Sequence, residues 1–134
     1  SAVNASGAFW AATYTGKLDA HTFVLFLRNF MKGRRTKVFL VVDGHPAHRA
    51  NAVKSYILET QGRLELHFLP PYAPDLNPDE FVWNYMKSTG VSKKPLKKNE
   101  SLRERVEQDL ANISLDAILV ASFFLAESVV YTAD

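Results

Sequence analysis

Residues 37–48 are KVFLVVDGHPAH, an apolar run that ends at an aspartate followed by a glycine. A continuous apolar run predicts a strand over residues 37–42 that is covered on both faces. Pro46 can open a helix that Gly62 ends, and residues 64–69, LELHFL, alternate as expected of a strand nearer the sheet edge. Strand, helix and strand at this spacing predict a right-handed parallel crossover and therefore an α/β fold.

Further elements are predicted before this crossover. Residues 1–5 and 8–15 have the composition of two strands joined by a turn, which predicts a hairpin. Asp19 can cap a helix whose apolar residues recur at helical spacing and which stops at Gly33. The sequence thus predicts a mixed sheet with flanking helices.

The C-terminal half is predicted to be helical. A proline-rich stretch, residues 70–78, precedes a helix over roughly residues 79–88. Ser101 and Glu104 have the spacing of a capping box in front of the next helix. Ser114 is the predicted N-cap of the last helix. The apolar side chains expected on that helix are Ile118, Leu119, Phe123 and Val130.

Composition limits the classes of protein to be considered. The chain has 134 residues, of which 47% are hydrophobic, enough for one domain or part of one. No apolar run reaches the roughly 18 residues that a membrane-spanning helix needs, so no membrane partner is expected. The lack of cysteine excludes disulfides and thiolate metal sites and fits a reducing compartment. A net charge of +2 does not by itself indicate nucleic-acid binding.

Asp43 directly follows the predicted buried strand. Sheets of α/β proteins bind ligands at the carboxyl ends of their strands, and Gly44 lets the backbone turn there. Position alone leaves two roles open for Asp43. It is either a turn or helix-capping residue, or a metal ligand.

Glu80 also has two interpretations. Asn77 at the N-cap, Pro78 at the first helical position and Glu80 at the third form a capping-box arrangement, which explains Glu80 without catalysis. Spacing alone favours this interpretation, but a helix N-terminus can also present a carboxylate near the end of a sheet. Lys87 falls on the same helix face as Glu80 and could reach a phosphate.

The histidines at positions 45 and 48 flank Pro46. Two histidines beside an aspartate can suggest zinc, but the sequence supplies no convincing third and fourth ligands. We expect His48 either to steady the Asp43 turn by a hydrogen bond or only to lie in the first turn of a helix.

A cluster of lysines falls between two predicted helices. These residues lie within twelve positions that contain no acidic residue, and Pro95 among them predicts a loop. A solvated linker is the favoured interpretation, and a loop that contacts phosphates is the alternative. The lysines are Lys87, Lys93, Lys94, Lys97 and Lys98.

Two segments together resemble a known family. Residues 38–48, VFLVVDGHPAH, resemble the second-aspartate motif of mariner-like DDE transposases of the bacterial insertion-sequence branch. Residues 69–87, LPPYAPDLNPDEFVWNYMK, resemble the block around that family's third carboxylate. Glu80 follows Asp43 by 37 positions, which is close to the separation in that family. The predicted hairpin and the start of the next helix, residues 19–23, fit as well.

The resemblance implies a ribonuclease H-like fold, DNA integration and recombination, and endonuclease activity that joins the cut ends to target DNA. It implies two divalent ions, Mg²⁺ or Mn²⁺, and it matches Asp43 and Glu80 to the second and third catalytic acids, which hold the metal. Transposon ends and target DNA become the expected partners, and the bacterial cytoplasm at the nucleoid the expected location. The candidates for supporting the acids or contacting DNA are His48, Asn77, Lys87, Lys93 and Lys94.

One part of the family pattern is missing. The family's first aspartate lies on a central strand upstream of the hairpin, but residues 1–18 contain no acid, and Asp19 falls at a helix start. We therefore expect residues 1–134 to be a partial catalytic domain, truncated at the N-terminus and lacking that strand, with a core over residues 1–88 and a helical part over residues 99–131. The strand edges left unpaired predict a re-paired hairpin strand, a homodimer or an edge-paired oligomer.

Three functions remain open at this point. The first is a fragment of a transposase catalytic domain that is inactive alone, so that whether the chain itself is an enzyme stays uncertain. The second is a non-catalytic module derived from a transposase that binds DNA or protein. A third, weaker one is a ribonuclease H-like nuclease unrelated to transposition, against which the Leu-Asn-Pro block of residues 76–78 speaks.

Overall fold

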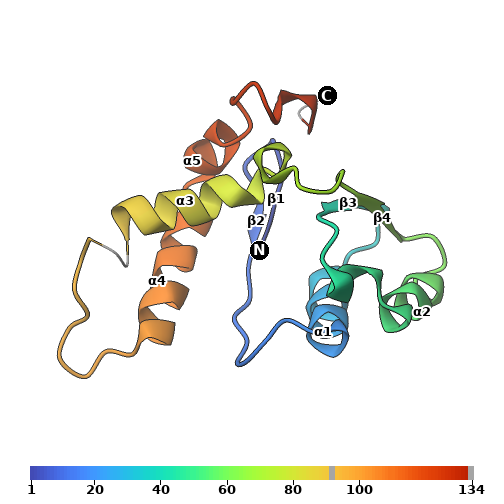
Figure 1. Cartoon of the computed structure of the whole chain (residues 1–134), viewed down its shortest axis with the longest axis horizontal. Coiled ribbons are helices and arrows are strands. Elements are labelled where there is room, and N and C mark those ends of the chain that lie inside the picture. Colours follow the sequence, from blue (N-terminus) through green and yellow to red (C-terminus); the bar gives the residue numbers. More distant parts are fainter. Residues whose placement is uncertain (91–92, 133–134) are drawn as a thin grey trace. The chain divides into compact units, whose positions relative to one another are not determined.

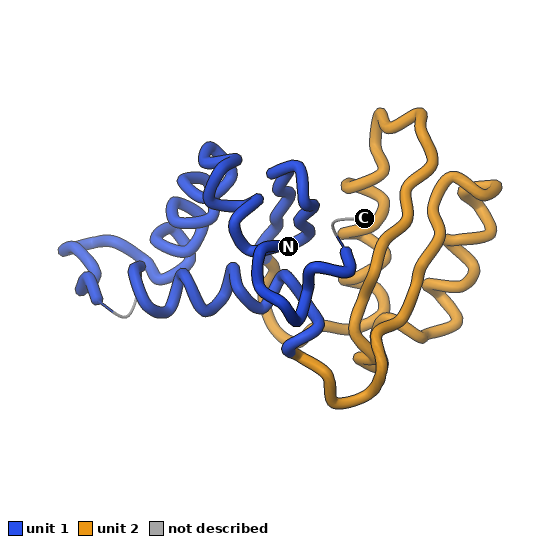
Figure 2. Tube along the Cα trace, turned by 90° about the horizontal axis from the view of Figure 1, so that it is seen from above, with its two compact units in different colours: residues 1–13, 75–134 blue, residues 14–74 orange. Residues whose placement is uncertain are grey.

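The computed structural model describes residues 1–90 and 93–132. The chain divides into two compact units, which Figure 2 colours separately. One unit consists of residues 14–74, and the other combines residues 1–13 with residues 75–134.

The unit of residues 14–74 contains the predicted crossover. Strand β3 (Val38–Val42) pairs in parallel with β4 (Leu64–Phe68), and the register runs from Val38 opposite Leu64 to Val42 opposite Phe68. A 3₁₀ turn (Pro46–Arg49) and helix α2 (Asn51–Glu59) connect the two strands. The prediction of a parallel strand pair is therefore confirmed.

The first helix of this unit, α1 (Ala20–Met31), forms where the sequence predicts it. The Asp19 carboxylate accepts a hydrogen bond from the Thr22 amide at 2.8 Å and so caps the helix. Gly33 follows the helix end at a φ of +76°, a conformation that favours glycine. The buried face of α1 consists of Phe23, Leu27, Phe30 and Met31.

Two expectations for this unit are wrong. β3 is not covered on both faces, because Phe39 is 62% exposed and Val41 44% exposed while Val42 is buried. The helices α1 and α2 lie on the same side of the strand pair (Figure 1), so alternate residues of β3 face away from them. The helix expected from Pro46 onward is also interrupted, because Ala50 adopts an extended backbone between the 3₁₀ turn and α2.

The other unit begins with a short hairpin. Strands β1 (Ala2–Val3) and β2 (Phe9–Trp10) pair antiparallel over only two residue pairs, fewer than the sequence predicts. The Asn4 side chain accepts hydrogen bonds from the Ser6 and Ala8 amides and so starts the turn early. In the described part of the chain the expected mixed sheet is thus two separate two-stranded sheets, one antiparallel and one parallel.

Three helices form the body of this unit: α3 (Asp79–Thr89), α4 (Leu102–Ser114) and α5 (Ala117–Ser122). The capping box at the start of α4 is confirmed, since the Ser101 hydroxyl accepts from the Glu104 amide and the Glu104 carboxylate from the Ser101 amide. The buried core of this unit consists of Val82, Met86, Leu110, Ile113, Val120, Phe123 and Phe124. Full burial of one such apolar side chain stabilises the fold by roughly 1.5–3 kcal/mol.

The predicted cap of the last helix is wrong. Asp116 rather than Ser114 caps α5, accepting a hydrogen bond from the Leu119 amide at 2.9 Å. The Ser114 hydroxyl instead donates to a carbonyl of α4, and aspartate is as good an N-cap as serine. With α5 starting later and ending at Ser122, Ile118 is 86% exposed and Val130 lies in a separate 3₁₀ turn.

The helices in the described ranges are short. The longest, α4, has 13 residues, whereas a helix needs about 20 residues to cross a bilayer. None of the described helices combines the length and the apolar character that a membrane span requires.

Candidate active site

The carboxyl ends of β3 and β4 place Asp43 at one edge of the parallel pair. Asp43 directly follows Val42, the last residue of β3, and its side chain is 53% exposed. Its Oδ1 accepts a hydrogen bond from the His45 amide at 2.9 Å. The turn therefore orients one oxygen of a carboxylate that remains about half exposed.

His48 holds this aspartate in place. Its Nδ1 lies 2.9 Å from Asp43 Oδ1 and 3.2 Å from the Asp43 carbonyl oxygen, and it donates when the proton is on Nδ1. The His48 side chain is only 12% exposed, and its ring centroid lies 4.2 Å from that of Phe23 on α1. The hydrogen bond expected from the sequence is therefore present, to the Asp43 carbonyl oxygen, and the mostly buried ring also contacts the exposed carboxylate.

The second histidine of the motif has a local role. His45 Nδ1 accepts a hydrogen bond from the Ala47 amide at 3.1 Å and so caps the 3₁₀ turn. Its ring centroid lies 5.6 Å from that of His48. Within residues 1–90 and 93–132 no group of three histidine, aspartate and glutamate side chains is placed to hold a metal ion.

Arg49 is a candidate that sequence reasoning missed. Its guanidinium carbon lies 4.1 Å from the Phe68 ring centroid, at the carboxyl end of β4. A Cβ built on Gly44 would lie 3.7 Å from Arg49 Nη2, so the guanidinium runs beside the residue that follows Asp43. The signal was the register of the parallel pair, which sets Phe68 opposite Val42 and thus next to the turn.

Glu80 lies in the other unit, in the first turn of α3. The Asn77 side chain accepts from the Asp79 amide at 3.1 Å, and the Asn77 carbonyl accepts from the Glu80 amide at 3.1 Å. Pro78 is the N-cap, and the Glu80 carboxylate makes no return bond to Asn77 in the described structure. The capping-box explanation of Glu80 is therefore wrong, because Asn77 caps through its neighbour and leaves this carboxylate unused.

The residues near Glu80 on α3 and after it are placed by hydrogen bonds and packing: Asp79 and Trp83 stabilise the helix, and the lysines are exposed. Asp79 Oδ2 accepts a hydrogen bond from the Trp83 indole Nε1 at 3.2 Å, and Trp83 packs against the buried core of its unit. Lys87 lies in the last turn of α3 and is exposed. The exposed residues Lys93 and Lys94 follow α3, and both of their amides donate to the carbonyl of Gly90.

The two candidate acids offer the ligand chemistry of a hard divalent cation. Mg²⁺ prefers oxygen ligands and is commonly held by one or two carboxylates together with substrate phosphates. Asp43 and Glu80 are both at least partly exposed carboxylates without an ion pair to lysine or arginine in the described ranges. Each belongs to a different unit. Each carboxylate by itself offers the kind of ligand that Mg²⁺ or Mn²⁺ prefers.

Comparisons with known proteins identify one matching family and one structure of similar fold. Residues 1–103 match the sequence model of the family described as DDE superfamily endonuclease. The structure resembles the crystal structure of the catalytic domain of the Mos1 mariner transposase, with a TM-score of 0.59 and 16% sequence identity. The match covers 90% of this chain and 65% of that structure. No curated protein sequence matches. The predicted fold class, α/β of the ribonuclease H-like kind, is confirmed by this likeness.

Proposed function

Because the chain belongs to the DDE superfamily endonucleases, we propose that residues 1–134 form part of a catalytic domain that cuts DNA strands and joins them to target DNA. The chain spans 65% of the matched transposase structure. The activity, the DNA partners and a location in the bacterial cytoplasm are therefore proposed for the whole protein.

The observation that carries this proposal is the position of Asp43. It stands at the carboxyl end of β3, where α/β sheets bind ligands, and its half-exposed carboxylate accepts from the His45 amide and lies 2.9 Å from His48 Nδ1. A turn residue that served only the backbone would have no need of the buried His48 behind it. This arrangement supports a role for Asp43 as a metal ligand.

Asp43 and Glu80 are the proposed metal ligands. Two divalent ions bound to such acids activate the attacking oxygen and stabilise the leaving oxygen of a phosphodiester. The chain's own residues orient and bind: His48 fixes the Asp43 carboxylate, and the Asn77 side chain shapes the start of α3 so that Glu80 is free. Arg49 and Lys87 supply positive charge for backbone phosphates.

We propose further that this chain alone cuts DNA poorly. The described residues bring together no three metal-ligating side chains, whereas the family's chemistry uses three acids. The same observation favours the second candidate function, a non-catalytic module that binds DNA or protein. The two candidates differ in whether activity appears when a third acid is supplied.

The test is a DNA-nicking assay with Mn²⁺ that compares this chain with a version extended upstream through a strand carrying an aspartate. We expect cleavage by the extended form, and its loss in both Asp43→Ala and Glu80→Ala. His67→Ala, which changes an exposed residue of β4, is the matched control and should leave cleavage unchanged. If neither form nicks DNA that carries transposon ends, the non-catalytic module becomes the better description.

A further inference from the structure

The loop between α3 and α4 carries a concentrated positive charge. Residues 93–98 include four lysines, all exposed, and no acidic residue. None of the four ammonium groups forms an ion pair in the described part of the chain, although Glu100 follows two residues later. The Glu100 carboxylate forms its ion pair with a different residue.

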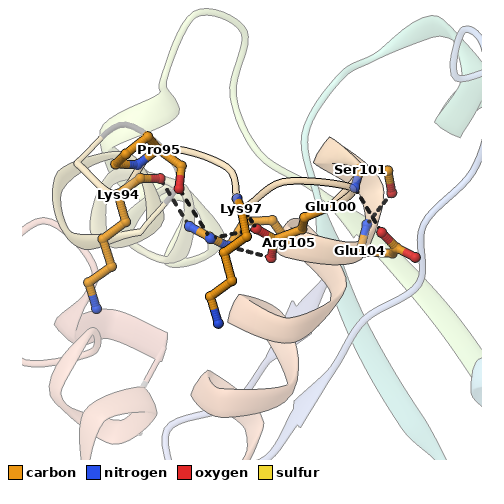
Figure 3. A network of polar contacts seen from close by, with 7 residues as sticks. All are labelled: Lys94, Pro95, Lys97, Glu100, Ser101, Glu104 and Arg105. Carbon is orange, nitrogen blue, oxygen red and sulfur yellow. Dashed lines mark hydrogen bonds and ion pairs between the residues drawn. The ribbon is translucent and has the colours of Figure 1, made fainter.

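Arg105 of α4 forms an ion pair with the Glu100 carboxylate. Its Nε lies 2.9 Å from Glu100 Oε1 and its Nη2 lies 2.7 Å from Oε2, a two-pronged pairing that fixes both groups (Figure 3). Arg105 is 8% exposed. The pairing lowers the pKa of Glu100 and raises that of Arg105, so both groups are charged at neutral pH.

The same ion pair also holds the loop backbone. Arg105 Nη1 donates to the Lys94 carbonyl at 3.0 Å, and Glu100 Oε2 accepts from the Lys97 amide at 2.8 Å. The Glu100 amide donates in turn to the Lys97 carbonyl at 3.0 Å. We call this set of contacts the Arg105 latch. It fixes the loop's backbone at Lys94 and Lys97 without using their side chains.

The latch leaves the lysine side chains free on one side. Figure 3 shows the Lys94 and Lys97 side chains extending from the loop in the same direction. Clustered ammonium groups repel each other, and a fixed backbone keeps them from spreading apart. A partner with closely spaced negative charges relieves this repulsion, and duplex DNA carries about one phosphate charge per 1.7 Å of helix axis.

We propose that the loop of residues 93–98 binds the phosphate backbone of DNA and that Arg105 and Glu100 are positioning residues for this contact. The choice of DNA as the partner rests on the proposed function above. The contact itself needs neither Asp43 nor Glu80 nor a metal ion. Phosphate contacts carry no sequence information, so this loop contributes affinity and orientation rather than specificity.

The lysines are tested by measuring the affinity for a short DNA duplex, by fluorescence anisotropy in EDTA, over about 50 to 200 mM salt. Lys97→Gln/Lys98→Gln should weaken binding on the order of tenfold at low salt and lower the slope of log Kd against log salt by about two. Lys32→Gln/Lys54→Gln removes the same charge from exposed lysines elsewhere and is the matched control. Equal losses in both pairs would overturn the proposal.

The latch is tested by two variants that change net charge in opposite directions. Arg105→Gln removes a positive charge and Glu100→Gln a negative one, but both remove the two-pronged ion pair of the latch, because an amide at position 100 has one acceptor oxygen in place of two. If the latch positions the loop, both variants weaken DNA binding, whereas Glu127→Gln, at an exposed site, does not. If Glu100→Gln instead tightens binding, net charge alone acts and the positioning role is overturned.

Folding and function are kept separate in these tests. Circular dichroism checks that each variant is folded, and Glu100→Gln, which retains hydrogen-bonding groups, remains informative if Arg105→Gln does not fold. Lysine-dependent DNA binding, together with no cleavage by the extended form in the nicking assay with Mn²⁺, would contradict the proposed function and leave the loop proposal standing. Lysine-dependent binding to anionic lipid vesicles, with none to DNA, would overturn the loop proposal alone.

Discussion

His48 Nδ1 lies 2.9 Å from Asp43 Oδ1 and 3.2 Å from the Asp43 carbonyl oxygen, so a mostly buried ring contacts an exposed carboxylate. The His48 ring packs against Phe23 of α1, so the orientation of Asp43 depends on a helix that ends before β3 begins. Mutation of residues that orient metal ligands typically lowers metal affinity or activity by about 10- to 100-fold.

His48→Ala is therefore expected to lower the Mn²⁺-dependent nicking rate of the extended chain by roughly 10- to 100-fold. The variant leaves Asp43 in place but removes the ring nitrogen that lies 2.9 Å from its Oδ1 and 3.2 Å from its carbonyl oxygen. His48→Asn, whose amide can still donate, should recover part of the rate. His45→Ala, which removes only the cap of the 3₁₀ turn, should cost less. A rate for His48→Ala equal to the unmodified rate would show that Asp43 needs no such support.

Arg49→Gln is expected to weaken the binding of DNA on the order of tenfold at low salt, as for the loss of one phosphate contact. Phe68→Leu should have a smaller effect in the same direction, because it removes the ring on which the guanidinium rests. Arg35→Gln, an exposed arginine of the same unit, is the control for net charge. Anisotropy titrations that show the same loss for the Arg49 and Arg35 variants would remove Arg49 from the site.

Local sequence signals predicted several of these features correctly. Two of them are helix caps, at Asp19 and at Ser101 with Glu104, and these depend on residues within a few positions of each other. The third is the parallel strand pair, which follows from the spacing of apolar residues along the chain. The hydrogen bond of His48 to Asp43 spans five positions and was also within reach. Such features form from short-range geometry.

The features that were missed depend on tertiary placement. Arg49 on Phe68 requires the strand register, and the Arg105 latch requires the path of a loop. The apolar run of β3 predicted a strand covered on both faces, but period alone does not say how many elements pack on it. The choice between Ser114 and Asp116 as a cap was undecidable from propensity, because both residues cap equally well.

Acid should destabilise the fold partly through Glu100. Its pKa lies below the ordinary value of 4.5 because it accepts hydrogen bonds from Arg105 and then from the Lys97 amide. A depressed carboxyl pKa means that the unfolded chain binds the proton more readily, so this stabilisation is present above 4.5 and is lost as pH falls through the folded-state pKa. In melts from about pH 7 to about pH 3, Glu100→Gln should flatten the decline in Tm. An unchanged decline would assign it to other carboxylates.

Gly90→Ala is expected to destabilise the unit of α3 and α4 by about 1–3 kcal/mol. A Cβ at Gly90 would lie 2.9 Å from the Met86 carbonyl oxygen and would collide with Asp109 Oδ2, and the carbonyl belongs to the helix backbone and cannot move aside. Gly44→Ala is the matched control, since its nearest neighbour is the flexible end of Arg49 at 3.7 Å. Urea denaturation should show a loss for Gly90→Ala and no loss for Gly44→Ala; equal stabilities would mean that α3 ends differently.

The unpaired edge of β3 and its exposed apolar side chains are expected to make the chain self-associate. Phe39 and Val41 project from a strand that pairs on one edge only among the described residues, and such an edge is open to a strand of a second copy. Sedimentation velocity should therefore detect dimers or larger oligomers that Phe39→Lys shifts toward monomer, because a charge on this face opposes strand addition. Leu58→Lys alters an even more exposed apolar residue, 79% accessible on α2, and should leave the distribution unchanged. A strict monomer at all concentrations, or an equal shift in both variants, would mean that this strand face does not mediate association.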